Sequence, residues 1–321
     1  MPETDAANQV RALEAGDIAA ITGLFQRTFR NARQPAPDSL KAYLTELFLN
    51  HHWHDPDLVS RVYIDGQGKV GGFIGVLPAR LVCNAKPVRA AIAGSLMVDN
   101  PAANPLAGAR LLRSFLAGPQ DLSISETANA VSMGMWERLG HTAVPAYSMD
   151  WLRIMRPAGF AVAGLAHRLR PARILAPAGA LADTISNRIG RTSLRPELQT
   201  RNFASDKAVG NDELIAHMPQ FIEHYDLRPD WDADALAWVL EHAARKERHG
   251  EIVKRMVYAR SGAPLGFYIY YKRPRDIGWV LQIMARADAA QGVVDSLLDH
   301  AWRHGCVALR RRSHPQITGV L

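Results

Sequence analysis

The sequence has few cysteines, few aromatic residues and no long uncharged apolar run, and each of these scarcities excludes a class of protein. Only Cys83 and Cys306 among the 321 residues are cysteines, and 7% of the residues are aromatic. Two distant cysteines, without a Cys-x-x-Cys motif or a histidine at ligand spacing, predict reduced structural thiols rather than a zinc site. No apolar run free of charges reaches the roughly 18 residues of a membrane-spanning helix.

The beginning of the chain also lacks the order of a secretory signal. Residues 1–8 are acidic and polar, whereas an export signal starts with basic residues followed by an apolar stretch. We therefore expect a cytoplasmic protein. The remaining composition, 48% hydrophobic and 21% charged, is typical of a globular chain with room for two domains.

The positive charge is concentrated in one segment. The net charge is +7, and residues 151–201 hold nine arginines against only Asp183 and Glu197. A nucleic-acid-binding domain instead spreads Lys and Arg over a folded face with aromatic residues between them, so we expect no DNA partner. Contact of this basic segment with RNA or an anionic membrane surface stays open, beside the alternative of packed helices with their arginines in solvent.

Apolar periodicity predicts a mixed α/β unit in the first 150 residues. Apolar residues first recur at helical spacing in two segments, with Asp17 and either Asp38 or Ser39 as their N-caps. After these helices the apolar residues follow a period of two, in strand segments separated by turn residues. We expect an antiparallel meander followed by one parallel crossover. The predicted order is strand, two helices, three strands, helix, strand and helix, over residues 10–13, 17–31, 38–47, 59–64, 70–82, 88–98, 106–116, 121–125 and 127–139.

The same order recurs in the second half. After residue 211 we predict two helices, three strands, a helix and a strand, which indicates a tandem duplication. Between the two patterns the chain is rich in Ala, Arg and Pro. The predicted domains are therefore 1–150, a basic helical linker over 151–205, and 206–321.

Residues 90–144 resemble the cofactor-binding half of a GCN5-related N-acetyltransferase (GNAT). In that family a strand leads into the loop Val-x-Pro-x-x-Arg-Gly-x-Gly-x-Gly/Ala, whose backbone N–H groups hold the CoA pyrophosphate at a helix N-terminus. The corresponding run is 98–112, where only Gly108 keeps a family glycine. The other pattern positions depart from the family: Ala103 at the arginine position, Asn104 and Leu106 at glycine positions, and Pro105, which has no N–H group.

The helix after the next strand follows the family spacing more closely. Asn129, Ser132 and Trp136 fall on the pattern Asn-x-x-Ala-x-x-x-Tyr-x-Lys-x-Gly-Phe, as do Arg138, Gly140 and His141. In the family the asparagine helps to hold the pantetheine arm, and a tyrosine often protonates the departing thiolate. Trp136 replaces that tyrosine, and an indole N–H is no general acid at neutral pH.

The resemblance implies transfer of an acyl group from acetyl-CoA or another acyl-CoA to a small-molecule amine by direct attack. A backbone amide in strand 97–99 would polarise the thioester carbonyl, and a carboxylate or water would accept the amine proton. Asp99 and Glu126 are the candidate bases, with a loop cap and a solvated helix start as their structural alternatives. The candidate cofactor-binding residues are Met97, Val98, Asn104, Leu106, Gly108, Ala109, Arg110, Asn129 and Ser132.

The second half lacks these motifs. It has no counterpart of the pyrophosphate loop or of the asparagine helix, and a GNAT unit would continue beyond Leu321 with a helix and two strands. We expect an incomplete, non-catalytic second unit that shapes the acceptor cleft or an interface. The histidines of loop 51–55 are adjacent in sequence and make a poor closed metal site, so no metal is predicted.

Two alternative functions remain open. The losses at Ala103, Pro105 and Trp136 favour a catalytically inactive protein that keeps a GNAT fold and binds a ligand or partner. The arginine-rich linker favours transfer from an aminoacyl-tRNA, as in related double-GNAT peptidyltransferases.

Overall fold

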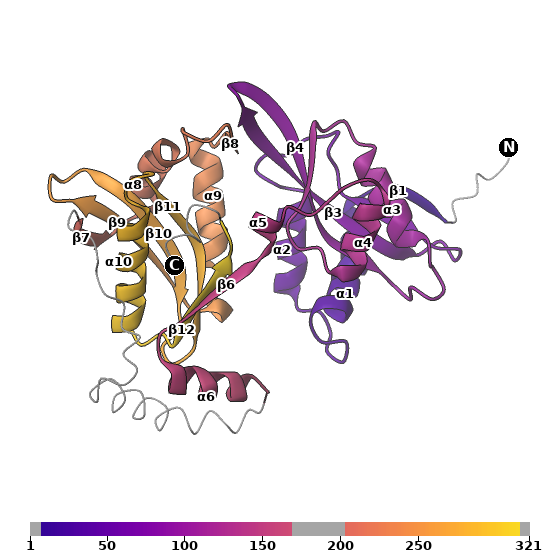
Figure 1. Ribbon diagram of the computed structural model, residues 1–321. Coiled ribbons are helices and arrows are strands. Elements are labelled where there is room, and N and C mark those ends of the chain that lie inside the picture. The colour runs from indigo at the N-terminus through magenta and orange to yellow at the C-terminus, as the bar shows by residue number, and fades with distance from the viewer. Residues whose placement is uncertain (1–7, 169–202, 315–321) are drawn as a thin grey trace. The chain divides into compact units, whose positions relative to one another are not determined.

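The computed structural model describes residues 8–168 and 203–314 and contains two compact units (Figure 1). The first unit comprises residues 1–143 and 225–235, and the second comprises residues 144–224 and 236–321. Each unit has its own sheet and hydrophobic core. None of the helices in the described ranges combines the length and apolarity that a membrane crossing requires.

A six-stranded sheet forms the centre of the first unit. Its elements are β1 (Gln9–Ala12), α1 (Ile18–Phe29), α2 (Asp38–Phe48), β2 (Arg61–Ile64), β3 (Val70–Cys83), β4 (Lys86–Val98), α3 (Ala107–Leu116), β5 (Leu122–Ser125), α4 (Ala130–Arg138) and β8 (Leu227–Pro229). The strand order is β1-β2-β3-β4-β5, with β8 paired to β3. β1 to β4 are antiparallel neighbours and β5 runs parallel to β4, which confirms the predicted fold class and element order.

Alternation along the strands divides the core between the two faces of this sheet. Val62 and Ile64 pack with residues of α1 and α2, whereas Tyr63 between them packs with residues of α3. Ile18 and Ile21, one helical turn apart, are 2% and 0% exposed. Helices therefore cover both faces, the arrangement expected of an α/β layer structure.

Of the predicted N-caps, Asp17 holds its position and the cap of the second helix is wrong. Asp17 is the N-cap residue of α1 but forms no side-chain capping bond; its carboxylate instead accepts two hydrogen bonds from the Arg11 guanidinium, at 2.7 and 2.8 Å. A bidentate pair of this kind is a strong, charge-assisted contact. The N-cap of α2 is Pro37, with no side-chain capping bond, and Asp38 is the first helical residue.

The second unit also has a six-stranded sheet. Its elements are α5 (Pro145–Ser148), β6 (Asp150–Ile154), α6 (Pro157–Arg168), β7 (Phe203–Ala208), α8 (Asn211–His217), α9 (Ala233–Ala244, which begins in the first unit), β9 (Glu251–Ala259), β10 (Pro264–Lys272), β11 (Ile277–Ala285), α10 (Ala290–Arg303) and β12 (Ala308–Arg312). The order is β6-β12-β11-β10-β9-β7, with β12 parallel to β11 and all other neighbours antiparallel. The predicted recurrence of two helices, three strands, a helix and a strand is present.

The segment predicted as a linker begins inside this second sheet. β6 pairs with β12, so that Ile154 lies opposite Ala308 and Asp150 opposite Arg312. The predicted helical piece that follows is present as α6, and residues 169–202 lie outside the described part of the chain. β6 and β7 give the sheet two strands more than the four predicted after residue 211.

After α8, residues 225–235 belong to the first unit again. β8 pairs with Leu81–Cys83 of β3, and the nearby Asp232 accepts a 2.9 Å hydrogen bond from the Trp53 indole and lies 3.2 Å from His52 Nε2. The histidine loop is thus tied to a segment about 180 residues away in sequence. The described residues contain no group of three His, Cys, Asp or Glu side chains placed to hold a metal.

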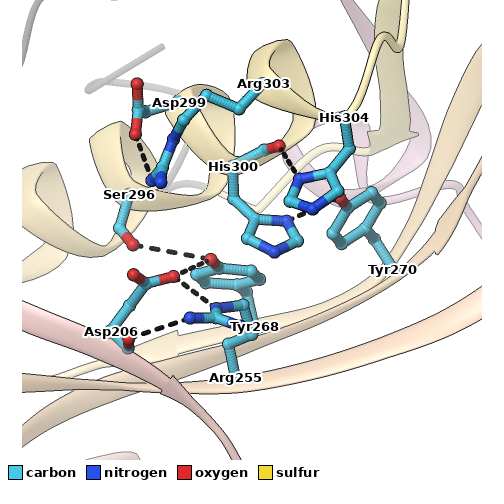
Figure 2. A network of polar contacts seen from close by, with 9 residues as sticks. All are labelled: Asp206, Arg255, Tyr268, Tyr270, Ser296, Asp299, His300, Arg303 and His304. Atoms are coloured by element: carbon cyan, nitrogen blue, oxygen red, sulfur yellow. Dashed lines mark hydrogen bonds and ion pairs between the residues drawn. The ribbon is translucent and has the colours of Figure 1, made fainter. Parts of the chain in front are cut away.

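A buried polar network lies between α10 and the second sheet (Figure 2). The Tyr268 hydroxyl donates to Asp206 at 2.7 Å, and Asp206 also pairs with Arg255. The Tyr270 hydroxyl lies 2.8 Å from Nδ1 of His300, which is 6% exposed. Burial, with a smaller effect of neighbouring positive groups, lowers the pKa of His300 to about 3, so this imidazole is neutral in the folded unit.

Candidate functional site

A cavity of 310 Å³ opens in the first unit where β4 and β5 separate. β5 pairs with β4 only over Ala90–Ala93, whereas β4 continues to Val98. Residues of α1 and of the start of α4 complete the walls. The lining residues are Phe25, Phe29, Ile74, Ala93, Gly94, Ser95, Leu96, Ser125, Thr127, Ala128, Asn129, Ser132 and Trp136.

The lining combines aromatic rings with uncharged polar groups. The rings of Phe25 and Phe29 meet edge to face with their centroids 5.0 Å apart. Serine and threonine hydroxyls and the Asn129 amide supply the polar part, and none of the described lining residues carries a charge. Such a cavity suits an uncharged ligand with an apolar body and a few hydrogen-bonding groups.

A bulge in β4 forms one wall. Phe73 of β3 pairs with Met97, but Gly75 pairs with Gly94, so Ser95 and Leu96 have no partner in β3. Ser95 has a φ of 54°, in the left-handed region that a serine rarely adopts. The bulge interrupts the strand pairing where Ser95 and Leu96 line the cavity, a place where a backbone N–H group could meet a developing oxyanion.

The first turn of α4 forms the opposite edge. Asn129 is the N-cap, and its Oδ1 accepts a 2.9 Å hydrogen bond from the backbone N–H of Ser132. Spacings of three and four place Asn129, Ser132 and Trp136 on one side of the chain, and all three line the cavity. Since capping uses only the oxygen of Asn129, its amide N–H groups remain as donors.

The loop between β4 and α3 is held by its own backbone. The carbonyl of Asn100 accepts from the N–H groups of Ala103 and Asn104 at 3.0 and 3.1 Å. α3 has no side-chain cap, and within the described chain no acceptor pairs with the N–H groups of Gly108 and Ala109. Free first-turn N–H groups and the positive end of the helix dipole favour an anion here.

Comparison with known proteins finds the same fold in solved structures. The sequence matches no family model and no curated protein. Its structure is similar to that of an Enterococcus faecalis V583 protein described as "Probable N-Acyltransferase" (TM-score 0.59, 10% identity, 95% of this chain). It is also similar to a GCN5-related N-acetyltransferase from Kribbella flavida (TM-score 0.56, 13% identity, 96% of this chain). The chain has a tandem GNAT fold.

A third solved structure has a similar fold, and this chain covers only part of the length of each of the three proteins. Saccharomyces cerevisiae N-myristoyltransferase, solved with bound myristoyl-CoA, matches 97% of this chain at a TM-score of 0.50 and 11% identity. The chain spans 65% and 64% of the Enterococcus and Kribbella proteins and 73% of the yeast protein. Likeness at these identities concerns the fold, so the chemistry has to be argued from the residues.

The predicted cofactor-binding residues of the GNAT half fall into two places. Asn129 and Ser132 line the cavity. The remainder lie on the strand, loop and helix that follow the bulge, outside the cavity lining: Met97, Val98, Asn104, Leu106, Gly108, Ala109 and Arg110.

Several members of this second group have structural partners. Met97 is 2% exposed and packs in the core below α1 and α2. The Asn104 amide donates to the carbonyl of Asp99 at 3.3 Å. Arg110, one of the predicted cofactor-binding residues, donates to the carbonyl of Asn8 at 2.7 Å. Their predicted contact with cofactor therefore rests mainly on backbone N–H groups.

Neither candidate base lines the cavity of the GNAT unit. Asp99 forms an exposed ion pair with Arg27, with 3.0 Å between Oδ2 and Nη2. Glu126 is exposed and lies between the lining residues Ser125 and Thr127. Their role as general base stays a prediction.

Sequence reasoning missed the aromatic wall and the bulge. Helical periodicity predicts Phe25 and Phe29 simply as apolar residues of the first helix, but Phe29 is 51% exposed and both line the cavity. The usable signal for the bulge was Gly94 within a strand, since an isolated strand glycine indicates a bulge or a close approach.

Proposed function

We propose that the first unit binds an acyl-CoA and transfers its acyl group to a small amine. The observation that supports this most directly is the uncharged cavity at the separation of β4 and β5, bounded by the β4 bulge and by Asn129. An acyl-pantetheine arm is uncharged, partly apolar and rich in amide groups, so it matches this lining.

The two ends of the cofactor would be held by different parts of the unit. The Asn129 amide and the hydroxyls of the cavity would bind the pantetheine arm, with the acyl chain against Phe25 and Phe29. The N–H groups of Gly108 and Ala109 at the start of α3 would bind the pyrophosphate. Proline at position 105 reduces the number of donors in the loop, so we expect weaker binding than a glycine-rich loop would give.

The proposed reaction is direct aminolysis of the thioester. The amine nitrogen forms a bond to the acyl carbon, and the carbonyl oxygen becomes an oxyanion next to the backbone of Ser95 and Leu96. The C–S bond then breaks and CoA leaves as a thiolate. The amine proton goes to water or to the predicted bases Asp99 or Glu126, and the thiolate takes its proton from water because Trp136 is no acid.

Release of the free CoA thiol in the presence of a panel of small amines tests this proposal. Turnover should saturate with acyl-CoA and should be lost in Ser132→Phe, which fills the cavity. Val131→Phe is the matched control, because the adjacent Val131 is 73% exposed and does not line the cavity. No thiol release with any amine, or equal rates for Ser132→Phe and Val131→Phe, would contradict the proposal.

A binding protein without turnover is the second candidate. Trp136 lines the cavity, and its ring packs edge-on against the rings of Phe115 and His141, with centroid distances of 5.9 and 5.4 Å. This packing fixes a side chain that donates a hydrogen bond but no proton. Saturable acyl-CoA binding without thiol release would favour this candidate.

A further inference from the structure

Basic residues from three distant parts of the sequence meet at one end of the second sheet. They occur in the runs 245–249 (Arg-Lys-Glu-Arg-His), 272–276 (Lys-Arg-Pro-Arg-Asp) and 310–312 (Arg-Arg-Arg). The first run precedes β9, the second joins β10 to β11, and the third belongs to β12. Pairing of the first residues of β9 with the last residues of β10 brings the first two runs together.

The third run joins them through an aromatic row. Tyr271 on β10 is the partner of Trp279 on β11, and Trp279 is the partner of Arg310 on β12. The Arg310 guanidinium lies 4.4 Å from the centroid of the Trp279 ring. The His249 ring stacks on Tyr271 at 5.5 Å and meets Trp279 edge-on at 5.3 Å. Trp279 is nevertheless 38% exposed, so part of an indole lies open among cations.

Positive charge in this region is only partly compensated. Burial is the first cause that lowers the pKa of His249, and the positive charges of Arg248, Lys246, Arg273 and Arg310 add to it. Arg273 has Asp276 at 2.8 Å, but Arg248 contacts the His249 ring at 3.1 Å and Arg310 contacts Trp279. Cations held together without matching carboxylates repel one another, and a bound anion relieves that repulsion.

We propose that this surface, formed by Arg248, His249, Arg273, Trp279 and Arg310 over the buried ring of Tyr271 and named here the Trp279 patch, binds single-stranded RNA. The arginines would contact phosphates, while Trp279 and the guanidinium plane of Arg310 offer surfaces on which bases stack. This proposal is independent of the acyl-transfer proposal, because every residue of the patch belongs to the second unit.

The chemistry of the patch favours this ligand over other anions. Its cations come from three elements rather than converging on one point, which matches a chain of phosphates better than a single phosphate ion. A duplex hides the faces of its bases, whereas a single strand presents them to an exposed indole. A lipid surface would require an extended apolar face beside the basic groups, and Trp279 is the one large exposed apolar residue within the patch.

Fluorescence anisotropy of a labelled 12-nucleotide oligouridylate, titrated with the full chain at low and moderate salt, tests the proposal. We expect saturable binding that weakens as salt rises. Trp279→Ala should weaken it by at least about fivefold, the loss of one stacked base. Arg248→Ala and Arg310→Ala should each reduce the slope of log K against log salt by about 0.7, the value for one phosphate contact.

The matched control is Arg260→Ala. Arg260 is an exposed arginine of the same unit, in the turn that follows the far end of β9, and we expect its variant to bind as the unmodified chain does. Circular dichroism would establish that all variants are folded. No RNA binding, the same loss in Arg260→Ala as in Arg310→Ala, equal affinity for duplex DNA, or binding to anionic vesicles without binding to RNA would each overturn the proposal.

Discussion

Protonation of His300 should destabilise the second unit in mild acid. The imidazole is buried between α10 and the sheet, and its Nδ1 lies 2.8 Å from the Tyr270 hydroxyl (Figure 2). Adding a proton would place a charge in that interior and would repel the nearby Arg255 and His304. Protonation of His300 has no such free-energy cost in the unfolded chain, because water solvates the imidazolium there.

The size of the effect follows from the two pKa values. The pKa of His300 is about 3 in the folded unit and about 6.5 in an unfolded chain. Between these values the unfolded state binds a proton that the folded state does not, so the free energy of unfolding decreases as the pH falls. The decrease approaches about 1.4 kcal/mol per pH unit well below about pH 6.5 and totals about 2 kcal/mol from roughly pH 6.5 to roughly pH 4.5. Above about pH 7.5 this contribution is constant.

Urea unfolding of the unmodified chain and of His300→Gln, each at the two ends of this pH window, measures the effect. Glutamine keeps a polar group near Tyr270 but does not titrate. The carboxylates titrate alike in both proteins, so the difference between their pH dependences isolates His300. We expect His300→Gln to lose about 2 kcal/mol less than the unmodified chain across the window. Equal losses in the two proteins would refute the reasoning.

Two further predictions concern the first unit. Asn129→Ala removes the acceptor of the Ser132 N–H group and should lower the free energy of unfolding by about 1 kcal/mol. The same variant should bind acyl-CoA more weakly, and unchanged affinity in a titration would speak against a contact between Asn129 and the cofactor. Gly75→Ala would place a Cβ 2.6 Å from Cζ of Phe48 and should cost about 1–3 kcal/mol in thermal unfolding. Gly94→Ala, whose Cβ would have no atom within 4 Å, is its control, and an equal loss in both would show that the contact with Phe48 is not the cause.

The order of elements was predictable because it depends on local periodicity. Apolar residues recur at helical spacing in α1 and α3, and residues 62–64 of β2 form a continuous apolar run; both patterns are local features of the sequence. That Asn129 and Ser132 share one side of α4 was predictable for the same reason, because residues three apart lie on one face of a helix. Their contact with a cofactor was predicted from the resemblance to the GNAT motif and stays a prediction.

Pairings between distant segments were not predictable in this way. β6 lies next to β12, and β8 lies next to β3, across separations of about 150 residues. Short strands carry little signal of which edge they join, because register and partner are set by the assembled sheet. The predicted linker and domain boundaries therefore placed β6 outside a sheet to which it belongs.

The clustering of charged residues on the folded surface was also not predictable from the sequence. Summing charge by segment leaves residues 206–321 without a distinctive excess, yet folding gathers Arg248, Arg273 and Arg310 around one indole. The feature that sequence analysis sought and did not find, cations with aromatic residues between them on a folded face, is formed by strand pairing.

Calorimetric titration of the full chain with acetyl-CoA and then with a longer acyl-CoA tests the central claim most directly. The account predicts saturable binding at one site, lost in Ser132→Phe and retained in Val131→Phe, because only position 132 lines the cavity between β4 and β5. Absence of heat with both ligands, or binding that Ser132→Phe leaves unchanged, would contradict it.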